Sequence, residues 1–329
     1  MIPTELTQGQ FDTVYNFLSL VVASQSFTAV FLLISLPRIL PRYRQAITVA
    51  IVVCGIAAYH YFRIFDSFRE AFVTDAVGGT GSYSQAVGAS FNEGYRYVDW
   101  LLTVPLLLVE LIAVLALARK VQTRLLVRLV PAAALMIALG YPGEISGDDG
   151  LRGLFGILST IPFAYILFVL FTQLSKSLVN QPAGVRGTLG RLRFLLLLSW
   201  GVYPIAYLLP LLDISGADAW VAKQVGYSVS DIVAKAVYAL VIFHVAKVKS
   251  YDDDRAFAGT ERSLADAPTS ARPRSDAARP DAAQPDGPRH DGPQHDGAHH
   301  DGLPPDGLPL DGPPLDRPQH ERPGAGAVA

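Results

Sequence analysis

Several ionisable side chains fall inside long apolar stretches of this sequence, where a charge is costly to bury and usually has a function. Lys235 lies in the apolar stretch of residues 217–247, and Asp231 precedes it by four residues in the sequence DIVAK. This spacing places the two side chains on one face of a helix. A buried lysine tends to lose its proton, which suits its amine to Schiff-base formation, and the protonated product needs carboxylate counterions. Asp231 and Asp99 are the candidates for that role.

A second polar set lies in the apolar sequence RYVDWLLTVPLLLVE. Arg96, Asp99, Thr103 and Glu110 are separated by three, four and seven residues, so they line one face of a helix with about 3.6 residues per turn. Asp99 and Glu110 are then about 16 Å apart along the axis, roughly half the hydrocarbon thickness of a membrane. This layout is expected of a proton path. The alternative is a set of buried ion pairs that only determines how the helices pack.

His60, in the sequence AYHYFRIF, is another candidate within an apolar stretch. A lone histidine in a helix is more often a packing residue than a functional one. Here a carboxylate face is available on another helix, so we predict that His60 hydrogen-bonds to Asp99 and holds its carboxylate in place.

Aromatic residues near these charges are suited to line a site for a large apolar cofactor. Trp100 follows Asp99, and the sequence WGVYPIAY contributes Trp200, Tyr203 and Tyr207. On its own, the same cluster is also typical of an ordinary hydrophobic core, so both interpretations stay open at this point.

Seven stretches are long and apolar enough to be membrane-spanning helices, which need about 20 residues each. We expect these helices at about residues 11–36, 45–67, 91–118, 122–140, 151–175, 190–212 and 217–248, the fourth being short. The sequence therefore predicts an all-α membrane protein, a seven-transmembrane-helix bundle, over residues 1–250. The first helix is expected to be retained, because the sequence MIPTELTQGQ lacks the basic region of a signal peptide.

Charged residues outside the apolar stretches predict the orientation. Basic residues concentrate after the odd-numbered spans: Arg38, Arg42, Arg44, Arg119, Lys120, Arg124, Lys176, Arg186, Arg191, Arg193, Lys247 and Lys249. Acidic residues concentrate after the even-numbered spans: Glu70, Asp75, Glu93, Glu144, Asp148, Asp149, Asp213 and Asp218. Basic loops face the cytoplasm, so we expect a plasma-membrane protein with its N-terminus outside and its C-terminus inside. The long second loop, residues 68–90, is a candidate extracellular hairpin.

The segment of residues 251–329 differs from the rest, because it consists mainly of Asp, Pro, Gly, Ala, Arg and His. Such a composition buries too little apolar surface to offset the entropy of ordering, so we expect a disordered cytoplasmic tail. Five of the seven histidines lie there (His290, His295, His299, His300 and His320). Metal binding by these histidines is one interpretation, and a solvated tether is the favoured one.

The overall composition excludes some functions. The chain has 27 basic and 29 acidic residues and a formal net charge of −2, so no nucleic-acid partner is expected. Its single cysteine, Cys54, cannot form a disulfide within the chain and lies in an apolar run, where we expect a small buried side chain.

The motifs RYVDWLLTVPLL, WGVYP and DIVAK, in this order, resemble those of the microbial rhodopsins, seven-helix proteins that bind retinal through a lysine of the last helix. The resemblance covers about residues 11–249. Three further sequences, AYHYFRIF, GYPGE (140–144) and LSTIPF (158–163), resemble the xanthorhodopsin-like branch, which is related to the proteorhodopsin-like proton pumps.

The resemblance implies a role for each charged residue. All-trans retinal forms a Schiff base with Lys235. Asp99 is the counterion and primary proton acceptor, with His60 as its partner, and Asp231 is the second counterion. The remaining roles are gating of the extracellular side by Arg96, completion of the Asp-Thr-Glu triplet by Thr103, and cytoplasmic proton donation by Glu110. The retinal is lined by Trp100, Trp200, Tyr203, Pro204 and Tyr207.

The Asp-Thr-Glu triplet distinguishes functions within the family. Chloride pumps lack a carboxylate at the position of Asp99, and many sensory members lack one at the position of Glu110. The resemblance therefore implies a light-driven outward proton pump, an ion transporter and not an enzyme, whose partners are protons and the lipid bilayer. The alternative is a sensory photoreceptor that signals through a partner, and a third class is a seven-helix receptor or transporter that does not respond to light.

Two positions differ from bacteriorhodopsin. Gly156 replaces a tryptophan that contacts the retinal ring there, which implies a window for a carotenoid antenna; the alternative is that glycine allows close helix approach. Lys223 replaces a glutamate of the proton-release pair, so rapid release of that kind is not expected. Members of the family often form pentamers or other rings, so a homo-oligomer is also implied.

Overall fold

The apolar stretches are helices in the computed structural model, which describes residues 2–74, 81–212 and 214–266. Within these residues, seven helices are long and apolar enough to cross a membrane. They are α1 (Gln8–Ser35), α2 (Pro41–Ala71), α3 (Gly94–Leu115), α4 (Arg119–Ile145), α5 (Asp149–Leu178), α6 (Ala183–Leu208), and a last span in which α7 (Ala217–Asp231), the π-helix η3 (Ile232–Val237) and α8 (Tyr238–Asp253) are continuous. The predicted seven-helix bundle is confirmed.

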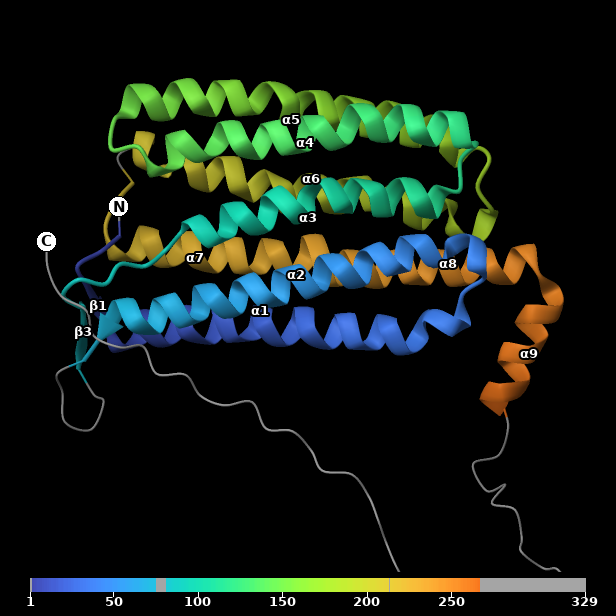
Figure 1. Ribbon diagram of the computed structural model, residues 1–329, viewed down its shortest axis with the longest axis horizontal. Coiled ribbons are helices and arrows are strands. Elements are labelled where there is room, and N and C mark those ends of the chain that lie inside the picture. The colour runs from blue at the N-terminus through green and yellow to red at the C-terminus, as the bar shows by residue number, and fades with distance from the viewer. Residues whose placement is uncertain (1, 75–80, 213, 267–329) are drawn as a thin grey trace, which may run out of the picture. The chain divides into compact units, whose positions relative to one another are not determined.

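Each helix from α1 to α6 packs against the next one along the chain, and the last span packs against α1, α2 and α6 to close the bundle (Figure 1). The larger hydrophobic core runs between these helices, and the single cysteine, Cys54, lies buried within it. Because lipid offers no partner to a charge, Asp99, Glu110, Asp231 and Lys235 are buried in this interior.

Local sequence signals explain where the helices begin and end. At the start of α1, the Thr7 side chain accepts a hydrogen bond from the Gln10 backbone, and the Gln10 side chain accepts one from the Thr7 backbone, forming a capping box. Pro41 is the first residue of α2, where its missing N–H is not needed. The Asp148 side chain caps α5 by accepting a hydrogen bond from the Leu151 backbone at 2.7 Å.

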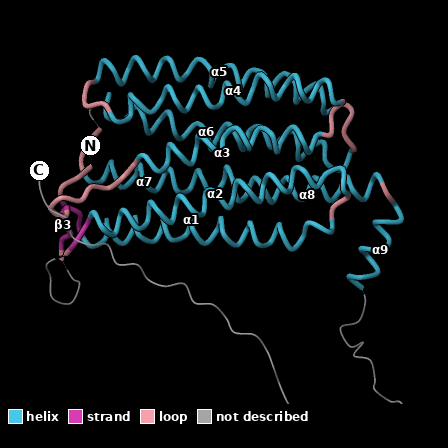
Figure 2. Tube along the Cα trace, viewed as in Figure 1, coloured by secondary structure: helices cyan, strands magenta, loops and turns pink. Residues whose placement is uncertain are grey.

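A small antiparallel sheet covers the end of the bundle at which α1 begins (Figure 2). It consists of β1 (Glu5–Thr7), β2 (Phe72–Val73) and β3 (Ser82–Gln85) in the order β1-β3-β2. The hairpin expected in the second loop is therefore present, although residues 75–80, which include Asp75 and two of its glycines, lie outside the described residues. Strand β1 was not predicted, because three residues directly before a helix carry no recognisable alternation.

An aromatic cluster anchors this sheet to the bundle. Phe68, Phe72, Phe91 and Trp220 are buried together, with the rings of Phe91 and Trp220 edge to face at 5.4 Å. The cluster joins α2, the segment before α3 and the start of α7, so it holds the ends of these helices together on the sheet side.

The bundle continues beyond residue 250, which corrects the predicted start of the tail. Residues 251–253 complete α8, and α9 (Arg255–Asp266) follows it at the opposite end from the sheet (Figure 1). Asp253 accepts a hydrogen bond from the Tyr43 hydroxyl at 2.6 Å and pairs with Arg42 at 2.9 Å, while Glu261 pairs with Arg38 at 2.9 Å. Composition alone does not reveal such partners in the first loop. The rest of the predicted tail, residues 267–329, lies outside the described residues.

The fourth span is longer than predicted. It extends over Arg119–Ile145, where hydropathy indicated only residues 122–140. The added turns carry Arg119, Lys120 and Glu144, because a helix continues through polar residues once its ends leave the apolar layer.

Candidate functional site

Lys235 lies in the π-helix η3, where the backbone turn is wider than in an α-helix and some carbonyl groups lose their regular partner. One of the residues that stabilises this turn is Gln25 of α1, whose side-chain amide donates a hydrogen bond to the Asp231 backbone carbonyl at 3.0 Å. Both Gln25 and Lys235 are buried. Helix α1 therefore helps to hold the segment that carries the lysine, a contribution that sequence analysis missed.

The Lys235 amine lies between two buried aspartates. Its nitrogen hydrogen-bonds to Asp99 Oδ2 and forms an ion pair with Asp231 Oδ1 at 3.1 Å. Lys235 is 1% exposed and both aspartates are fully buried. Burial of a charge without a partner would be strongly unfavourable, so the three groups stabilise one another. The predicted pairing of Lys235 with both counterion candidates is present.

The two aspartates differ in how many hydrogen-bond donors surround them. Asp231 accepts hydrogen bonds from the hydroxyls of Tyr61 and Tyr203 and, at 3.3 Å, from the Trp100 indole. The Asp99 Oδ1 atom has no hydrogen-bond partner among the described residues. Both oxygens of Asp231 are therefore occupied by donors, whereas Asp99 has an oxygen free to accept a proton.

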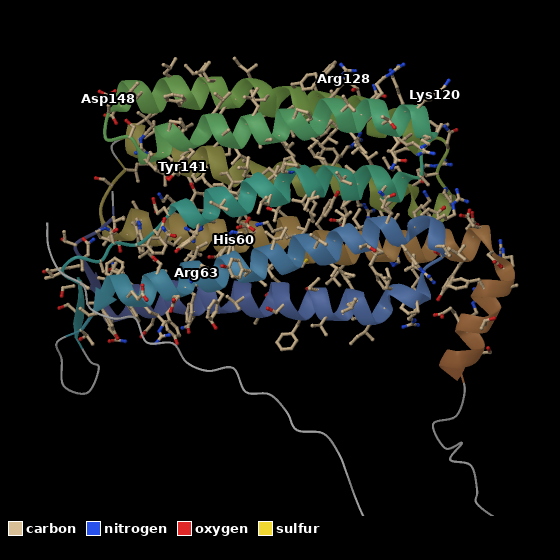
Figure 3. All side chains as sticks on the ribbon, viewed as in Figure 1. His60, Arg63, Lys120, Arg128, Tyr141 and Asp148 are labelled. Atoms are coloured by element: carbon tan, nitrogen blue, oxygen red, sulfur yellow. The ribbon has the colours of Figure 1, made fainter. Side chains whose placement is uncertain are left out.

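Thr103 and His60 lie close to Asp99 in different ways. The Thr103 hydroxyl donates to the Asp99 backbone carbonyl at 2.8 Å. The structure shows no hydrogen bond between His60 and the Asp99 carboxylate: His60 Nδ1 is 3.1 Å from the Ile56 carbonyl oxygen one turn earlier, and Asp99 Oδ1 has no partner among the described residues. The role of His60 as the partner of Asp99 stays a prediction. His60 is buried about midway along the bundle (Figure 3), where the Ile56 carbonyl lies within hydrogen-bond distance of one of its ring nitrogens.

On the sheet side of this cluster lies Arg96. Its Nη1 donates to Gln224 Oε1, and its guanidinium lies 5.7 Å and 5.3 Å from the ring centres of Tyr61 and Tyr227. The Nε and Nη2 atoms have no hydrogen-bond partner among the residues described. Arg96 thus borders the cluster on the side nearer the sheet.

A second ion cluster follows Arg96 toward the end of the bundle. Lys223 pairs with Glu93 at 3.1 Å and with Glu144 at 3.0 Å, and the Gln224 amide donates to Glu93 at 3.1 Å. Burial alone would raise the pKa of the Glu93 carboxyl, but the Lys223 ammonium and these hydrogen bonds bring that pKa below its usual value. Sequence analysis identified Lys223 but missed both of its carboxylate partners.

Glu110 lies on α3 on the side of Asp99 opposite to Arg96, about 16 Å from Asp99 along the helix axis. Its side chain is fully buried, and neither carboxyl oxygen has a hydrogen-bond partner within the described part of the chain. A carboxyl group without a partner in an apolar interior is held most readily in its neutral, protonated form.

A mostly apolar cavity of about 390 Å³ lies next to the Asp231 cluster. Its walls include the predicted carotenoid window, Gly156, and the five residues predicted to line retinal: Trp100, Trp200, Tyr203, Pro204 and Tyr207. Since Trp100 and Tyr203 also donate to Asp231, the cavity and the charged cluster share two walls. This arrangement suits an extended apolar molecule that reaches the lysine at one end.

Gly156 contacts the ring of Tyr207. A side chain at this position would place its Cβ only 2.9 Å from the Tyr207 ring, closer than such atoms approach in proteins. Tyr207 is fixed from its other end, where its hydroxyl donates to the Arg152 carbonyl at 2.8 Å. The glycine is therefore needed for close helix approach, and it also borders the cavity at a place where the neighbouring Ile157 is 67% exposed.

Basic residues predominate at the α9 end of the bundle, whereas the sheet end carries more acidic residues. Figure 3 shows Asp148 at the sheet end and Lys120 and Arg128 toward the end at which α9 lies. Helix α3 begins beside the sheet, so Arg96 is nearer the acidic end and Glu110 is nearer the basic end.

These features define a seven-helix membrane protein with a buried lysine between two aspartates and an aromatic-lined cavity beside them. The sequence model of the bacteriorhodopsin-like protein family matches residues 13–248. The chain belongs to this family, the microbial rhodopsins.

Individual relatives agree with this assignment. The green-light absorbing proteorhodopsin of Gamma-proteobacterium EBAC31A08 is 28% identical over 232 residues, which cover 70% of this chain and 85% of that protein. Among solved structures, xanthorhodopsin, described as a light-driven ion pump with dual chromophore, is 44% identical with a TM-score of 0.72. Thermophilic rhodopsin is 43% identical with the same TM-score. Each of these two matches covers 77% of this chain and 99% of the chain in the solved structure.

The predicted class is thereby confirmed. The protein is a multi-pass membrane protein of the microbial rhodopsin type, a light-driven ion transporter, and the family binds retinal through a lysine. The roles of individual residues, the direction of transport and the carotenoid remain predictions.

Proposed function

We propose that this protein pumps protons outward across the plasma membrane in response to light, with retinal bound to Lys235. The single observation that carries the proposal is the contact between the Lys235 nitrogen and Asp99, whose second carboxyl oxygen is free to accept a proton. Glu110 lies on one side of this pair and Arg96 on the other, so donor, lysine, acceptor and outlet follow one another through the bundle.

The residues present fit all-trans retinal. The primary amine of Lys235 stands in for the nitrogen that would carry the chromophore, and the adjoining cavity offers Trp100, Trp200, Tyr203 and Pro204 as walls. Retinal, when bound, supplies absorption of visible light and an isomerisation that lowers the proton affinity of that nitrogen.

Asp99 is the proposed primary acceptor. Its Oδ2 atom already hydrogen-bonds to the Lys235 nitrogen, so the proton has a short path. The two tyrosine hydroxyls and the indole that surround Asp231 keep that carboxylate in place as a constant counterion. The proton that leaves the nitrogen is therefore expected to go to Asp99 and not to Asp231.

Glu110 is the proposed donor. Its lack of hydrogen-bond partners keeps the proton on the carboxyl group until the Lys235 nitrogen has lost its own. Its position toward the basic end of the bundle lets it recover a proton from the cytoplasm, which gives the transport its outward direction.

The distribution of charged residues supports this orientation. Basic residues near the α9 end, such as Lys120 and Arg128, are typical of the cytoplasmic side, and the sheet end is then extracellular. Proton release would pass Arg96 and Gln224 to the Glu93 and Lys223 cluster. Because Lys223 holds Glu93 and Glu144 as ion pairs, we expect release to be slow compared with acceptance by Asp99.

Pumping is tested by illuminating retinal-loaded cells while the external pH is recorded, with and without a protonophore. Acidification that the protonophore abolishes is the expected result, and Asp99→Asn should abolish it and shift absorption to the red. No pH change would point instead to the sensory photoreceptor, and unchanged acidification by Asp99→Asn would exclude Asp99 as the acceptor.

We also propose a carotenoid antenna beside Gly156. The proposal is supported by Gly156 in the cavity wall and by the exposed side chain of the neighbouring Ile157, because a carotenoid in the surrounding lipid could contact the end of the retinal cavity there. Energy transfer from an added carotenoid, measured as an extra band in the excitation spectrum of transport, should disappear in Gly156→Trp. An identical spectrum in both proteins would exclude the antenna. Assembly into a homo-oligomer stays a prediction.

A further inference from the structure

Two buried polar side chains remain without hydrogen bonds on the α9 side of Lys235. The hydroxyl of Tyr238 and both carboxyl oxygens of Glu110 have no hydrogen-bond partner among the described residues, and both side chains are fully buried. Burial of a polar group without a hydrogen bond destabilises the folded protein. Two such groups in one region of an otherwise apolar interior call for a functional explanation.

The positions of these groups place Tyr238 between the lysine and the donor. Tyr238 follows η3 directly, three residues and about 4.5 Å along the axis from Lys235 toward the α9 end. Glu110 lies in the same direction from Asp99, which contacts Lys235. Helices α3 and α8 pack against each other, and Leu108 and Leu111 beside Glu110 belong to the same buried core cluster as Tyr238, so the two groups face the same part of the interior.

We propose that Tyr238 relays the proton from Glu110 to the Lys235 nitrogen, an inference that rests on the proposed function. A hydroxyl is both a donor and an acceptor, and the relay needs both properties. A water held between the Glu110 carboxyl and the Tyr238 hydroxyl would have polar partners on both sides.

The transfer balances without any further reactant. The O–H bond of the Glu110 carboxyl breaks, and its proton reaches the Tyr238 oxygen through the water. The phenol releases its original proton toward the Lys235 nitrogen in the same step. Glu110 ends as a carboxylate, Tyr238 as a neutral phenol, and the nitrogen is protonated.

A packing role for Tyr238 makes the opposite prediction. If the ring only fills the core, its unsatisfied hydroxyl is destabilising. Tyr238→Phe should then leave the photocycle kinetics unchanged and the protein equally or more stable. The substitution removes one oxygen and retains the ring, so it separates the two roles cleanly.

The first test is flash photolysis of retinal-loaded Tyr238→Phe. We expect return of the proton to the Lys235 nitrogen to slow by at least about tenfold, because a positioned proton-transfer group commonly contributes more than that. The absorption maximum and the early transfer to Asp99 should stay as in the wild type. Tyr165→Phe is the matched control, since this tyrosine is on α5, which packs mainly on α4 and α6.

The second test does not depend on pumping. The infrared carbonyl band of protonated Glu110, assigned by its loss in Glu110→Gln, should shift in retinal-free Tyr238→Phe and stay in place in Tyr165→Phe. An unshifted band overturns the pairing of Glu110 with Tyr238.

The two proposals can fail separately. A Tyr238→Phe variant that pumps with wild-type kinetics overturns the relay and leaves the pump intact. A wild-type protein that does not acidify its medium overturns the proposed function, and the infrared band of the retinal-free protein still decides whether Glu110 and Tyr238 are paired.

Discussion

Gln25 donates a hydrogen bond to the backbone carbonyl of Asp231 at 3.0 Å, linking α1 to the π-helical turn that carries Lys235. A carbonyl group opened by a π-helix needs a partner from elsewhere, and in a membrane interior water is scarce. This contact gives α1, none of whose residues lines the cavity, an influence on the geometry of the lysine.

Replacement of Gln25 should therefore disturb both stability and colour. We expect Gln25→Leu to lower the free energy of unfolding by about 1–3 kcal/mol, because it leaves the Asp231 carbonyl without this donor. The absorption maximum of the retinal-loaded protein should also move, because Asp231 pairs with Lys235. Absorption spectra and the rate of thermal bleaching measure both effects, and a variant unchanged in both would show that η3 does not depend on Gln25.

Glu110→Gln tests the donor. The substitution keeps the size of the side chain and removes its transferable proton, so the late part of the photocycle should slow by about 10²-fold or more while colour is retained. Flash photolysis at several pH values is the measurement. Decay as rapid as in the wild type would assign the donor role to another residue.

The Lys223 cluster predicts a pH dependence of stability. The pKa of Glu93 is lowered in the folded protein, so its ion pair contributes stability above the pKa of the unfolded chain, and this contribution is lost as the pH falls through the lower, folded value. The difference in stability between the wild type and Glu93→Gln should be full at neutral pH and vanish at acidic pH. Thermal bleaching measured across this range checks the sign, and a difference that grows toward acid would contradict it.

Lys249 closes the end of α3. Its ammonium donates to the carbonyls of Val114 and Leu115, at 2.9 Å and 3.1 Å, and to the Gln181 side chain at 2.8 Å. The next residue, Ala116, has a left-handed backbone with φ of 50°, which is unfavourable for alanine. The lysine therefore supplies the capping that the local sequence lacks.

Lys249→Met should cost about 1–3 kcal/mol, because it keeps most of the side-chain volume and removes the donor to the Val114 carbonyl, while the Leu115 carbonyl keeps its hydrogen bond from Gln181 Nε2 at 3.3 Å. The matched control is Lys247→Met. In the wild type, the Lys247 ammonium lies 5.6 Å from the Tyr251 ring centre, and its loss should change the free energy of unfolding by less than about 0.5 kcal/mol. Equal stability of the two variants would show that α3 needs no cap from α8.

Charged residues in apolar stretches are conspicuous in a sequence, and for this reason Asp99, Asp231 and Lys235 could be predicted to meet. Gln25, Tyr61 and Gln224 could not. Uncharged polar residues are common in membrane helices, and which of them faces the interior depends on how each helix is rotated when it packs. Their roles became visible only through the contacts with Asp231 and Arg96.

His60 shows a different limit. Its burial and its position on α2 follow from the sequence, but its hydrogen-bond partner does not, because the ring can also reach the carbonyl of Ile56 in its own helix. A helix offers every histidine such an alternative, so spacing alone cannot decide between a local acceptor and a carboxylate on another helix.

The central claim is that light moves a proton from the Lys235 nitrogen to Asp99. Time-resolved infrared spectroscopy of the retinal-loaded protein measures this directly, because a carboxyl group that gains a proton produces a new carbonyl band. The account predicts a band that rises as the nitrogen loses its proton and is missing from Asp99→Asn. A wild-type protein without this band, or an Asp99→Asn variant that retains it, would contradict the account.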